Sequence, residues 1–275
     1  MRIIKVLFWN LNNKNLVFPI RDLIVENCPD VVAMVETRNL DIPTLLNKLR
    51  TDMMEWNAIE VSPKSDIRVL SKKEIDIVPF KEESHYSIYK IKKNDEIAIL
   101  LVVVHLLSKM NKSDEGQLFC TSNVSRELVK YEQELFGTSD FKTIIVGDFN
   151  MQPYEPAMCG PMGFNATMSA CQAKKITRKA AEEEVYFYYN PMWALMGANR
   201  LVQGSYYNTN DNNYHAIYWY SFDSVLLRPH FVDCFNWDYF EIIEKTEKHN
   251  FVPNTTIDKE HYSDHLPIKF EIIGG

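Results

Sequence analysis

The sequence lacks a long hydrophobic segment and an excess of positive charge. Its longest apolar run, Ile97 to Val104, is far shorter than the roughly 20 residues of a membrane-spanning helix. The 275 residues carry a net charge of −7, with 37 acidic side chains against 30 Lys and Arg. Because proteins that coat duplex nucleic acid are usually basic, we do not expect strong non-specific binding to nucleic acid. A local basic groove is still compatible with this composition.

Closely spaced cysteine pairs are also missing. The cysteines are odd in number and widely separated, at positions 28, 120, 159, 171 and 234, and no Cys-x-x-Cys occurs. This spacing argues against a zinc ribbon or a disulfide framework. The first residues enter a strand-like run instead of the apolar stretch and cleavage site of a signal peptide. We therefore expect reduced thiols and a cytoplasmic protein.

The composition suits a folded chain with a sizeable core. Apolar residues make up 46% and charged residues 24% of the sequence, so bulk disorder is not expected. A chain of this length can form one large domain or two small ones. Since we find no internal repeat, linker or low-complexity segment, we predict a single domain over residues 1–275.

Strand-like and helix-like segments alternate along the chain. Apolar runs and period-two patterns predict strands at residues 5–10, 30–36, 56–61, 67–70, 75–78, 85–91, 96–105, 143–148, 217–227 and 268–273. Helical spacing predicts helices at residues 18–26, 40–49 and 118–135, the last one ending at Gly137. The alternation indicates α/β layers, and the many short strands indicate largely antiparallel pairing.

The stretch from Thr143 to Asn150 carries the clearest chemical signal. Its apolar, β-branched residues run into Gly147, and Asp148 and Asn150 follow two positions apart. Alternation along a strand turns these two polar side chains to one side and Phe149 into the core. A carboxylate and an amide there suit a hard cation, an activated water or a phosphate oxygen. A turn capped by Asp and Asn is the plainer interpretation of this stretch alone.

Several other strands end in, or carry, a polar side chain. These side chains belong to Asn10, Glu36, His105, Asp223, Asp264 and His265. In layered α/β folds ligands bind at strand ends, so we expect these groups to converge. Carboxylate and amide oxygens suit Mg²⁺ or Mn²⁺, whereas the wide separation of the histidines disfavours zinc. An acid inside the strand at Asp223 is costly unless paired, and its chemistry suits orienting the His265 imidazole.

Taken singly, each of these residues has a structural explanation. A strand-end Asn or Glu is often a cap, and His105 follows eight apolar residues as a core histidine would. The basic cluster at residues 174–179 is followed by acids, which favours an exposed helix with alternating charge over a phosphate-binding patch. The aromatic run at residues 186–189 is equally compatible with core packing and with stacking on a substrate ring.

The ordered set of motifs changes that balance. It consists of Trp9-Asn10, Met34-Val35-Glu36, Val104-His105-Leu106, Gly147-Asp148-Phe149-Asn150, Phe222-Asp223 and Ser263-Asp264-His265-Leu266-Pro267. In residue type, order and separation the set resembles the endonuclease/exonuclease/phosphatase superfamily, also called DNase I-like, and covers nearly the whole chain. The resemblance implies an α/β (α+β) fold, a four-layered αββα sandwich of two packed, mostly antiparallel sheets flanked by helices.

The resemblance also implies a chemistry, metal-dependent phosphoester hydrolysis, and a role for each motif residue. Asn10 and Glu36 would hold Mg²⁺ or Mn²⁺, with Asp264 nearby or at a second metal. Asp148 would align or deprotonate the attacking water, and Asn150 would steady the water or a phosphate oxygen. His265, oriented by Asp223, would act as a base or stabilise the phosphorus centre. His105 would bind phosphate or protonate the leaving oxygen.

We therefore expect a Mg²⁺-dependent phosphodiesterase or nuclease acting on DNA or RNA. The segment His105 to Ser108-Lys109 resembles the phosphodiesterase and nuclease members, whereas Asn12 and His105 depart from the abasic-site endonuclease pattern. One alternative is a phosphomonoesterase or a lipid-headgroup phosphodiesterase of the same fold, which the acidic charge favours. A catalytically silent binding module is the other. The irregular stretch 158–215 is the expected specificity region.

Overall fold

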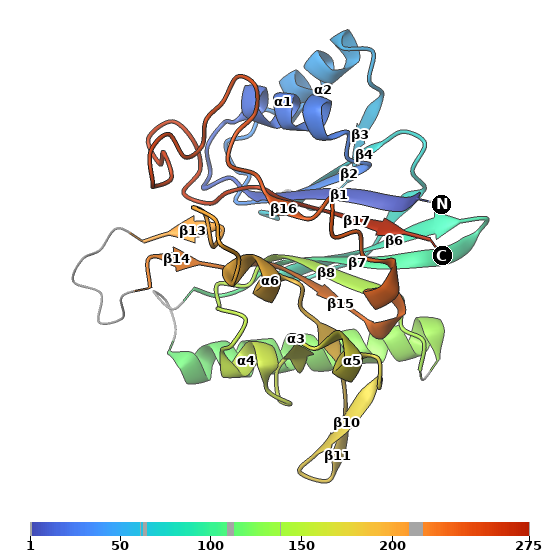
Figure 1. Ribbon diagram of the computed structural model, residues 1–275. Helices are drawn as coiled ribbons and strands as arrows, with labels where there is room; N and C mark the ends of the chain where they lie inside the picture. Colours follow the sequence, from blue (N-terminus) through green and yellow to red (C-terminus); the bar gives the residue numbers. More distant parts are fainter. Residues whose placement is uncertain are drawn as a thin grey trace.

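The computed structural model describes residues 2–60, 62, 65–108, 113–137, 139–208 and 217–274, with the side chains of residues 2 and 3 left aside. Two large sheets, each formed by strands from distant parts of the chain, make up the centre of this structure (Figure 1). Of the helices in the described ranges, none has the length and apolarity that crossing a bilayer requires. All the cysteines are free thiols.

The first sheet brings the two ends of the chain together. Its strand order is β16 (Glu241–Ile242), β17 (Ile268–Ile273), β1 (Arg2–Asn10), β2 (Val31–Val35), β4 (Arg68–Lys72) and β3 (Trp56–Ala58). Among these strands β1 and β2 are parallel, and the other pairings are antiparallel. The parallel pair places the carboxyl ends of β1 and β2 at the same edge.

The second sheet also has a parallel pair of strands at its centre. Its order is β5 (Ile77–Glu82), β6 (Tyr86–Lys93), β7 (Glu96–His105), β8 (Thr143–Asp148), β15 (Asp223–Leu227), β12 (Tyr188–Tyr189) and β9 (Ala166–Thr167). The central pair β7–β8 is parallel, and β15 runs antiparallel to β8. The carboxyl ends of β7 and β8 and the start of β15 therefore meet at one edge.

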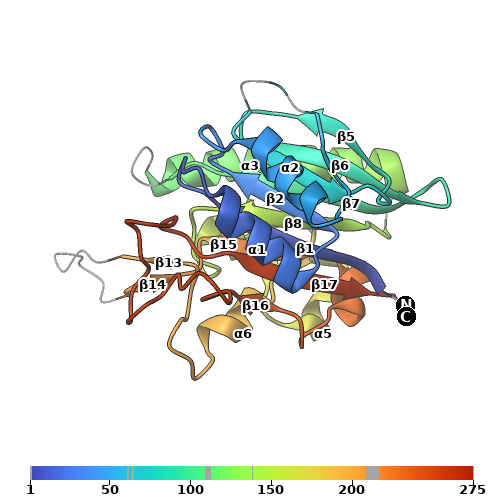
Figure 2. The ribbon, with the colours of Figure 1, turned by 90° about the horizontal axis from the view of Figure 1, so that it is seen from above.

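Helices cover the outer faces of the two sheets. Helices α1 (Val17–Asn27) and α2 (Ile42–Thr51) lie over the first sheet, and α3 (Asp114–Phe136), α4 (Pro156–Cys159) and α5 (Ala170–Ala173) lie over the second (Figures 1 and 2). The predicted α/β (α+β) sandwich, with mostly antiparallel sheets packed between helices, is confirmed. The remaining elements are β10 (Thr177–Ala180), β11 (Glu183–Tyr186), α6 (Met192–Met196), β13 (Tyr206–Tyr207), β14 (Trp219–Tyr220) and the 3₁₀ helix Pro229–Cys234.

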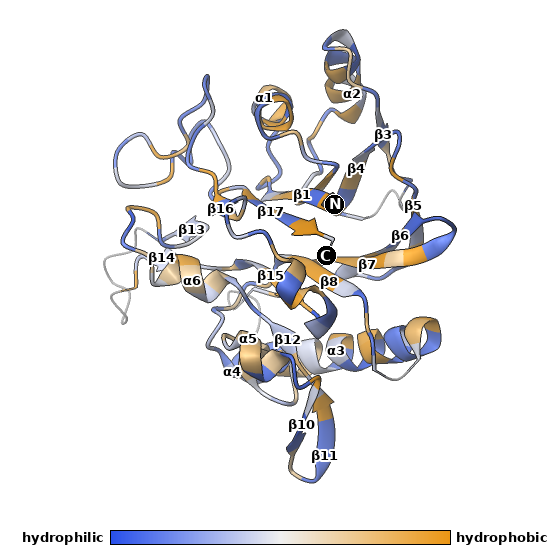
Figure 3. Cartoon of the chain, turned by 45° about the vertical axis from the view of Figure 1, so that its right-hand side comes forward, coloured by the Kyte–Doolittle hydropathy of each residue, from blue (hydrophilic) through white to orange (hydrophobic). Residues whose placement is uncertain are grey.

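Apolar side chains of both sheets share the central core. Residues of β1 and β2 such as Phe8 and Met34 belong to the same buried cluster as Val103 of β7 and Val146 of β8. A second cluster lies beneath α3, where Leu128 packs with side chains of the outer face of the second sheet. Figure 3 shows hydrophobic colour on the central strands and hydrophilic colour over most of the β10–β11 hairpin. Because strands covered on both faces exclude water, their polar ends stand out at the rim.

The structure corrects two sequence predictions. The charged stretch after residue 173 is exposed as expected, but it forms the β10–β11 hairpin instead of a helix. Its turn residues Ala181 and Glu182 have φ of 48° and 71°, which a helix does not allow. The strand predicted over 217–227 is broken between β14 and β15, because residues on its two sides join different sheets.

Other predictions in these regions are confirmed. Phe149 is fully buried against Phe164, as the alternation predicted. In the aromatic run, Phe187, Tyr188 and Tyr189 are buried, which supports core packing there. Two parts of the sequence predictions lie outside the described residues, namely Lys109 at the end of the segment from His105 and residues 209–215 of the expected specificity region.

Candidate active site

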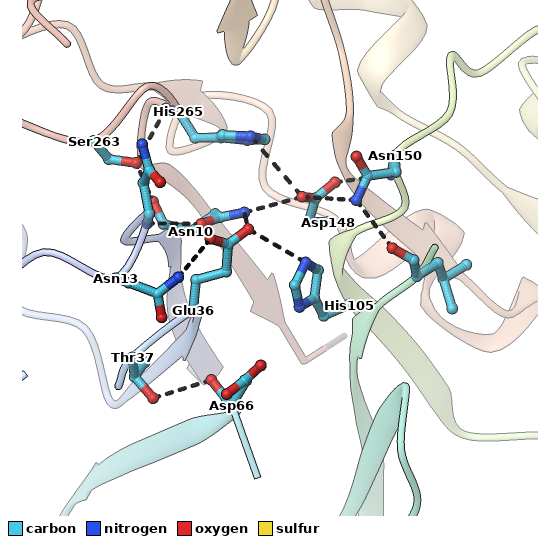
Figure 4. A network of polar contacts seen from close by, with 12 residues as sticks. Asn10, Asn13, Glu36, Thr37, Asp66, His105, Asp148, Asn150, Ser263 and His265 are labelled. Atoms are coloured by element: carbon cyan, nitrogen blue, oxygen red, sulfur yellow. Dashed lines mark hydrogen bonds and ion pairs between the residues drawn. The ribbon is translucent and has the colours of Figure 1, made fainter. Parts of the chain in front are cut away.

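The polar strand ends meet at one edge of the two sheets (Figure 4). In the first sheet the last residue of β1, Asn10, pairs in register with Val35, and Glu36 follows directly. In the second sheet His105 at the end of β7 is opposite Asp148 at the end of β8, which in turn pairs with Asp223. The parallel pairs thus place residues from both sheets on either side of a shared rim.

The amide of Asn10 links the carboxylates of the two sheets. Its Nδ2 donates to Glu36 Oε1 at 3.1 Å and to Asp148 Oδ2 at 3.0 Å, and its Oδ1 accepts from the Asn12 N–H at 2.9 Å. On the far side His105 Nε2 lies 3.4 Å from Glu36 Oε1. In this arrangement Asn10 fixes the separation of two carboxylates. Ligation of a metal through its oxygen stays a prediction.

Asp148 is buried, and its carboxylate is held by a short local turn. Oδ1 accepts the Asn150 N–H at 2.8 Å, and Oδ2 accepts Asn150 Nδ2 at 3.1 Å. The same Nδ2 donates to the Leu106 carbonyl at 3.0 Å, which ties the end of β8 to the end of β7. Asn150 has φ of 54°, and Glu36 has φ of 52°, so both site residues are in the left-handed region. Such backbone conformations concentrate at functional sites.

His265 lies between two acids. Its Nδ1 is 2.7 Å from Asp223 Oδ2, and its Nε2 is 3.9 Å from Asp148 Oδ2. Two hydrogen bonds anchor the loop at residues 263–265 to the end of β1. Ser263 Oγ donates to the Asn10 carbonyl at 2.6 Å, and Trp9 Nε1 donates to the His265 carbonyl at 2.8 Å. The pairing of His265 with Asp223, inferred from chemistry, is therefore confirmed as a contact.

Charge on the imidazoles is stabilised by the surrounding acids. Burial alone lowers the pKa of His265, but the carboxylates of Asp223 and Asp148 outweigh it and raise this pKa to about 10. For His105, too, burial lowers the pKa, and the hydrogen bond with Glu36 and the charge of Asp148 raise it above the ordinary value. The same bond from His105 lowers the pKa of Glu36. Burial raises the pKa of Asp148, against the opposing charge of His265.

The side chains present suit a divalent cation. Ligand atoms of Glu36, His105 and Asp148 lie within 4.8 Å of one another, and so do those of Asp148, Asp223 and His265. Asp223 Oδ1 is buried and has no hydrogen-bond partner among the described residues. The two groups together contain three acids, two of them buried, and two imidazoles. Since an unpaired buried carboxylate is costly, added positive charge at this rim would be stabilising.

Asp264 lies beside the cluster without joining its groups of closely spaced ligand atoms. It lies in the loop between Ser263 and His265, outside both groups of closely spaced ligand atoms found in the described residues. Its charge nevertheless acts on the neighbouring side chains of His265, Tyr206 and Lys259. The structure therefore places Asp264 next to the cluster, and its role as a ligand stays a prediction.

Two neighbours of the site were not selected from the sequence. Asn13 Nδ2 donates to Glu36 Oε2 at 3.1 Å, so both carboxylate oxygens are held. His85 precedes β6, and its carbonyl accepts the His105 N–H at 2.9 Å. The Asn12-Asn13 pair after the first strand was a sequence signal for the former. No local pattern marked His85, because only strand pairing brings it to His105.

Comparison with known proteins places this geometry in a familiar fold. No protein-family model and no curated protein matches the sequence. Among solved structures, truncated TDP2 from Caenorhabditis elegans is similar, with a TM-score of 0.58 and 13% identity over 98% of each chain. The 3′-5′ exonuclease NExo from Neisseria meningitidis has a TM-score of 0.57 and 13% identity, covering 98% of this chain and 100% of that one.

An AP endonuclease from Archaeoglobus fulgidus is similar to the same degree. It has a TM-score of 0.56 and 15% identity, and the match covers 98% of this chain and 99% of that chain. The match thus extends over the whole architecture, from the β1–β2 pair to the C-terminal strand. At such low identity it establishes the fold and leaves the substrate open. The protein has the fold of the endonuclease/exonuclease/phosphatase superfamily, also called DNase I-like.

Proposed function

We propose that the protein is a phosphodiesterase that uses Mg²⁺ or Mn²⁺ to hydrolyse phosphodiester bonds of DNA or RNA. The observation that carries this proposal is the convergence of Asn10, Glu36, His105, Asp148 and His265 at one rim, through contacts that join the two sheets. The free thiols further support the proposal that it works in the cytoplasm.

In this proposal Glu36 and the amide oxygen of Asn10 would hold the cation, and Asn13 keeps the Glu36 carboxylate in place. Asp264 is the candidate for an additional ligand. The bound cation would polarise a phosphoryl oxygen and offset the negative charge that grows there. Asp148, with its raised pKa, would accept the proton of the attacking water, and Asn150 would steady that water or a phosphate oxygen.

The two histidines, each close to Asp148, would act on the phosphorus centre. His265 is kept charged by its acids, so its Nε2 can donate to a phosphoryl oxygen and stabilise the transition state. His105 is held by Glu36, and its raised pKa suits it to bind phosphate or to protonate the leaving oxygen. Asp223 orients His265 through Nδ1 and leaves Nε2 facing the rim.

Proteins with the same fold support a nucleic-acid substrate. NExo is described as a 3′-5′ exonuclease, and in a second structure as a 3′ phosphatase bound to a product DNA hairpin. The others include an AP endonuclease and the endonuclease domain of TRAS1, a telomere-specific retrotransposon. These names cover exonuclease, endonuclease and phosphatase activities, so they favour phosphoester hydrolysis more strongly than any one substrate.

The test is hydrolysis of single-stranded DNA, RNA and a small synthetic phosphodiester by purified protein with Mg²⁺ or Mn²⁺. Asp148→Ala and His265→Ala should each lower kcat/KM by at least about 100-fold, since each removes a group that touches the reacting atoms. His230→Ala is the matched control, because His230 forms an exposed pair with Asp140 at 2.8 Å and follows the end of β15 opposite to Asp223. Full activity of either site variant would refute the assignment.

A phosphomonoesterase or headgroup phosphodiesterase is the second candidate. The net charge of −7 favours it, because a polyanionic substrate is repelled by an acidic protein. A panel of small phosphomonoesters and headgroup diesters, measured beside the polynucleotides, separates the two. Preference for a small ester over every polynucleotide would replace the nuclease proposal while keeping the same catalytic residues.

A further inference from the structure

A pocket with no role in the proposed chemistry lies beside His105. It has a volume of about 380 Å³ and is formed where the loop before β6 meets the first turns of α3. Its lining includes His85, Tyr86, Leu107, Phe119, Asn123 and Glu127. Ligand pockets in proteins begin at about 300 Å³, so this one can take a single ring system.

Hydrogen bonds link the walls of the pocket to residues of the catalytic rim. The His105 N–H donates to the carbonyl of His85, which lines the pocket, at 2.9 Å. The buried side chain of Gln117 donates from Nε2 to the Leu107 carbonyl at 2.7 Å and to the Asn150 carbonyl at 3.2 Å. One amide of α3 therefore holds both a wall of the pocket and the turn that positions Asp148. The pocket therefore adjoins the strand end that carries His105.

Phe119 marks the pocket as a site for a flat ring. The side chain is 69% exposed, although it is a large apolar group on the second turn of α3. Figure 1 shows the start of α3 at the edge of the molecule that also carries β13 and β14. An aromatic face beside a phosphoester site is suited to stacking, because every nucleobase has a π-face.

The acids of the pocket exclude a phosphate there. Glu83 and Glu127 both line it, and Glu127 Oε2 accepts the Tyr86 hydroxyl at 2.7 Å. Carboxylates repel a phosphate but accept hydrogen bonds from ring N–H and amino groups. The lining thus matches a nucleobase and opposes a second backbone contact.

We propose that this pocket binds the nucleobase next to the cleaved phosphodiester, stacked on Phe119. The inference rests on the proposed function, because it assigns a subsite to that substrate. It makes Phe119 a determinant of substrate preference, acting through binding and leaving the chemical step unchanged. Substrates with a base at this position are favoured over phosphodiesters without one.

The test compares two oligonucleotides of equal length, one with all its bases and one with an abasic analogue next to the cleaved bond. For Phe119→Ala, kcat/KM on the first should fall about tenfold through KM, as expected for one base–aromatic stack, and on the second it should not change. Phe119→Tyr should restore the first value. Phe18→Ala is the matched control, because Phe18 is 58% exposed on α1 and outside the pocket.

Equal losses on both oligonucleotides, or no loss on either, would overturn the subsite. Failure of the wild-type protein to cleave any phosphodiester would instead overturn the proposed function. In that case fluorescence anisotropy with the same two oligonucleotides decides on the subsite. Phe119→Ala should then weaken binding of the base-containing strand about tenfold, and unchanged binding would refute the pocket assignment.

Discussion

His265 shows how single side chains set the charge of this site. Its imidazole contacts Asp223 through Nδ1 and faces Asp148 through Nε2, and all three side chains are buried. Burying charges costs several kcal/mol per ion unless each is paired, so the trio is stable only as a unit. This coupling explains why the pKa of His265 is raised to about 10 despite burial. The residue thus keeps a positive charge at the rim where the proposed function places the phosphoryl group.

Replacing Asp223 by Asn tests this arrangement. The amide oxygen still accepts from Nδ1, but the charge that stabilises the imidazolium is gone. We expect kcat/KM for phosphodiester hydrolysis to fall by about 100-fold or more. Asp30→Asn is the control, since Asp30 is another buried acid, paired with Lys72 at 3.0 Å before the start of β2. Both variants should lose stability on thermal unfolding, and only the first should lose activity.

At the scale of elements, the contact between β7 and β8 determines where the site residues lie. Gly147 pairs with Val104, and a Cβ added at this glycine would lie 2.0 Å from the Val104 carbonyl oxygen. The neighbouring pair in the register is His105 and Asp148. A side chain at residue 147 would therefore push apart the two strands whose ends carry catalytic candidates. The glycine is required here by close approach of two backbones.

We expect Gly147→Ala to lower the free energy of unfolding by about 3 kcal/mol, because backbone atoms must move to relieve the overlap. Activity should fall about 100-fold as well, since a shift of about 1 Å at a reacting group has that effect. Gly137→Ala is the control. Gly137 caps α3 with φ of 83° and has open space around it, so it should cost about 1 kcal/mol and leave activity unchanged. Denaturant unfolding and initial rates measure both quantities.

At the scale of the whole molecule, the site lies where the two sheets contact each other. Glu36 follows a strand of the first sheet and Asp148 ends a strand of the second, and Asn10 bridges them. Acids from both halves of the sandwich thus face each other across the rim. A cation bound there would hold the two sheets together, and its binding free energy would add to the stability of the fold.

Divalent-cation binding should therefore raise the thermal unfolding temperature. At about 100 times the dissociation constant, Mg²⁺ or Mn²⁺ should add about 2.7 kcal/mol, and a chelator should reverse the effect. Glu36→Gln should abolish this stabilisation because it removes a ligand charge. Glu55→Gln, which removes an exposed acid paired with Lys73, should retain it. An unchanged unfolding temperature of the wild type across the cation titration would contradict the metal assignment.

The sequence by itself determined the local elements and the residue types of the site. Apolar periodicity predicted α3 and its end at Gly137, and alternation predicted that Phe149 points inward. Such patterns succeed because they depend on neighbours a few residues away. The same reasoning marked Glu36, His105 and Asp148 as polar ends of apolar strands.

Only the tertiary structure decided which of these groups touch. The Asn10 amide bridging Glu36 and Asp148, and the strand end that brings His85 to His105, follow from the order of strands in two sheets. Strand order also explains why residues 217–227 divide into β14 and β15 and why Asp264 lies beside the cluster. Contacts between residues far apart in sequence depend on sheet order and on packing of the two sheets, and local periodicity carries no information about either.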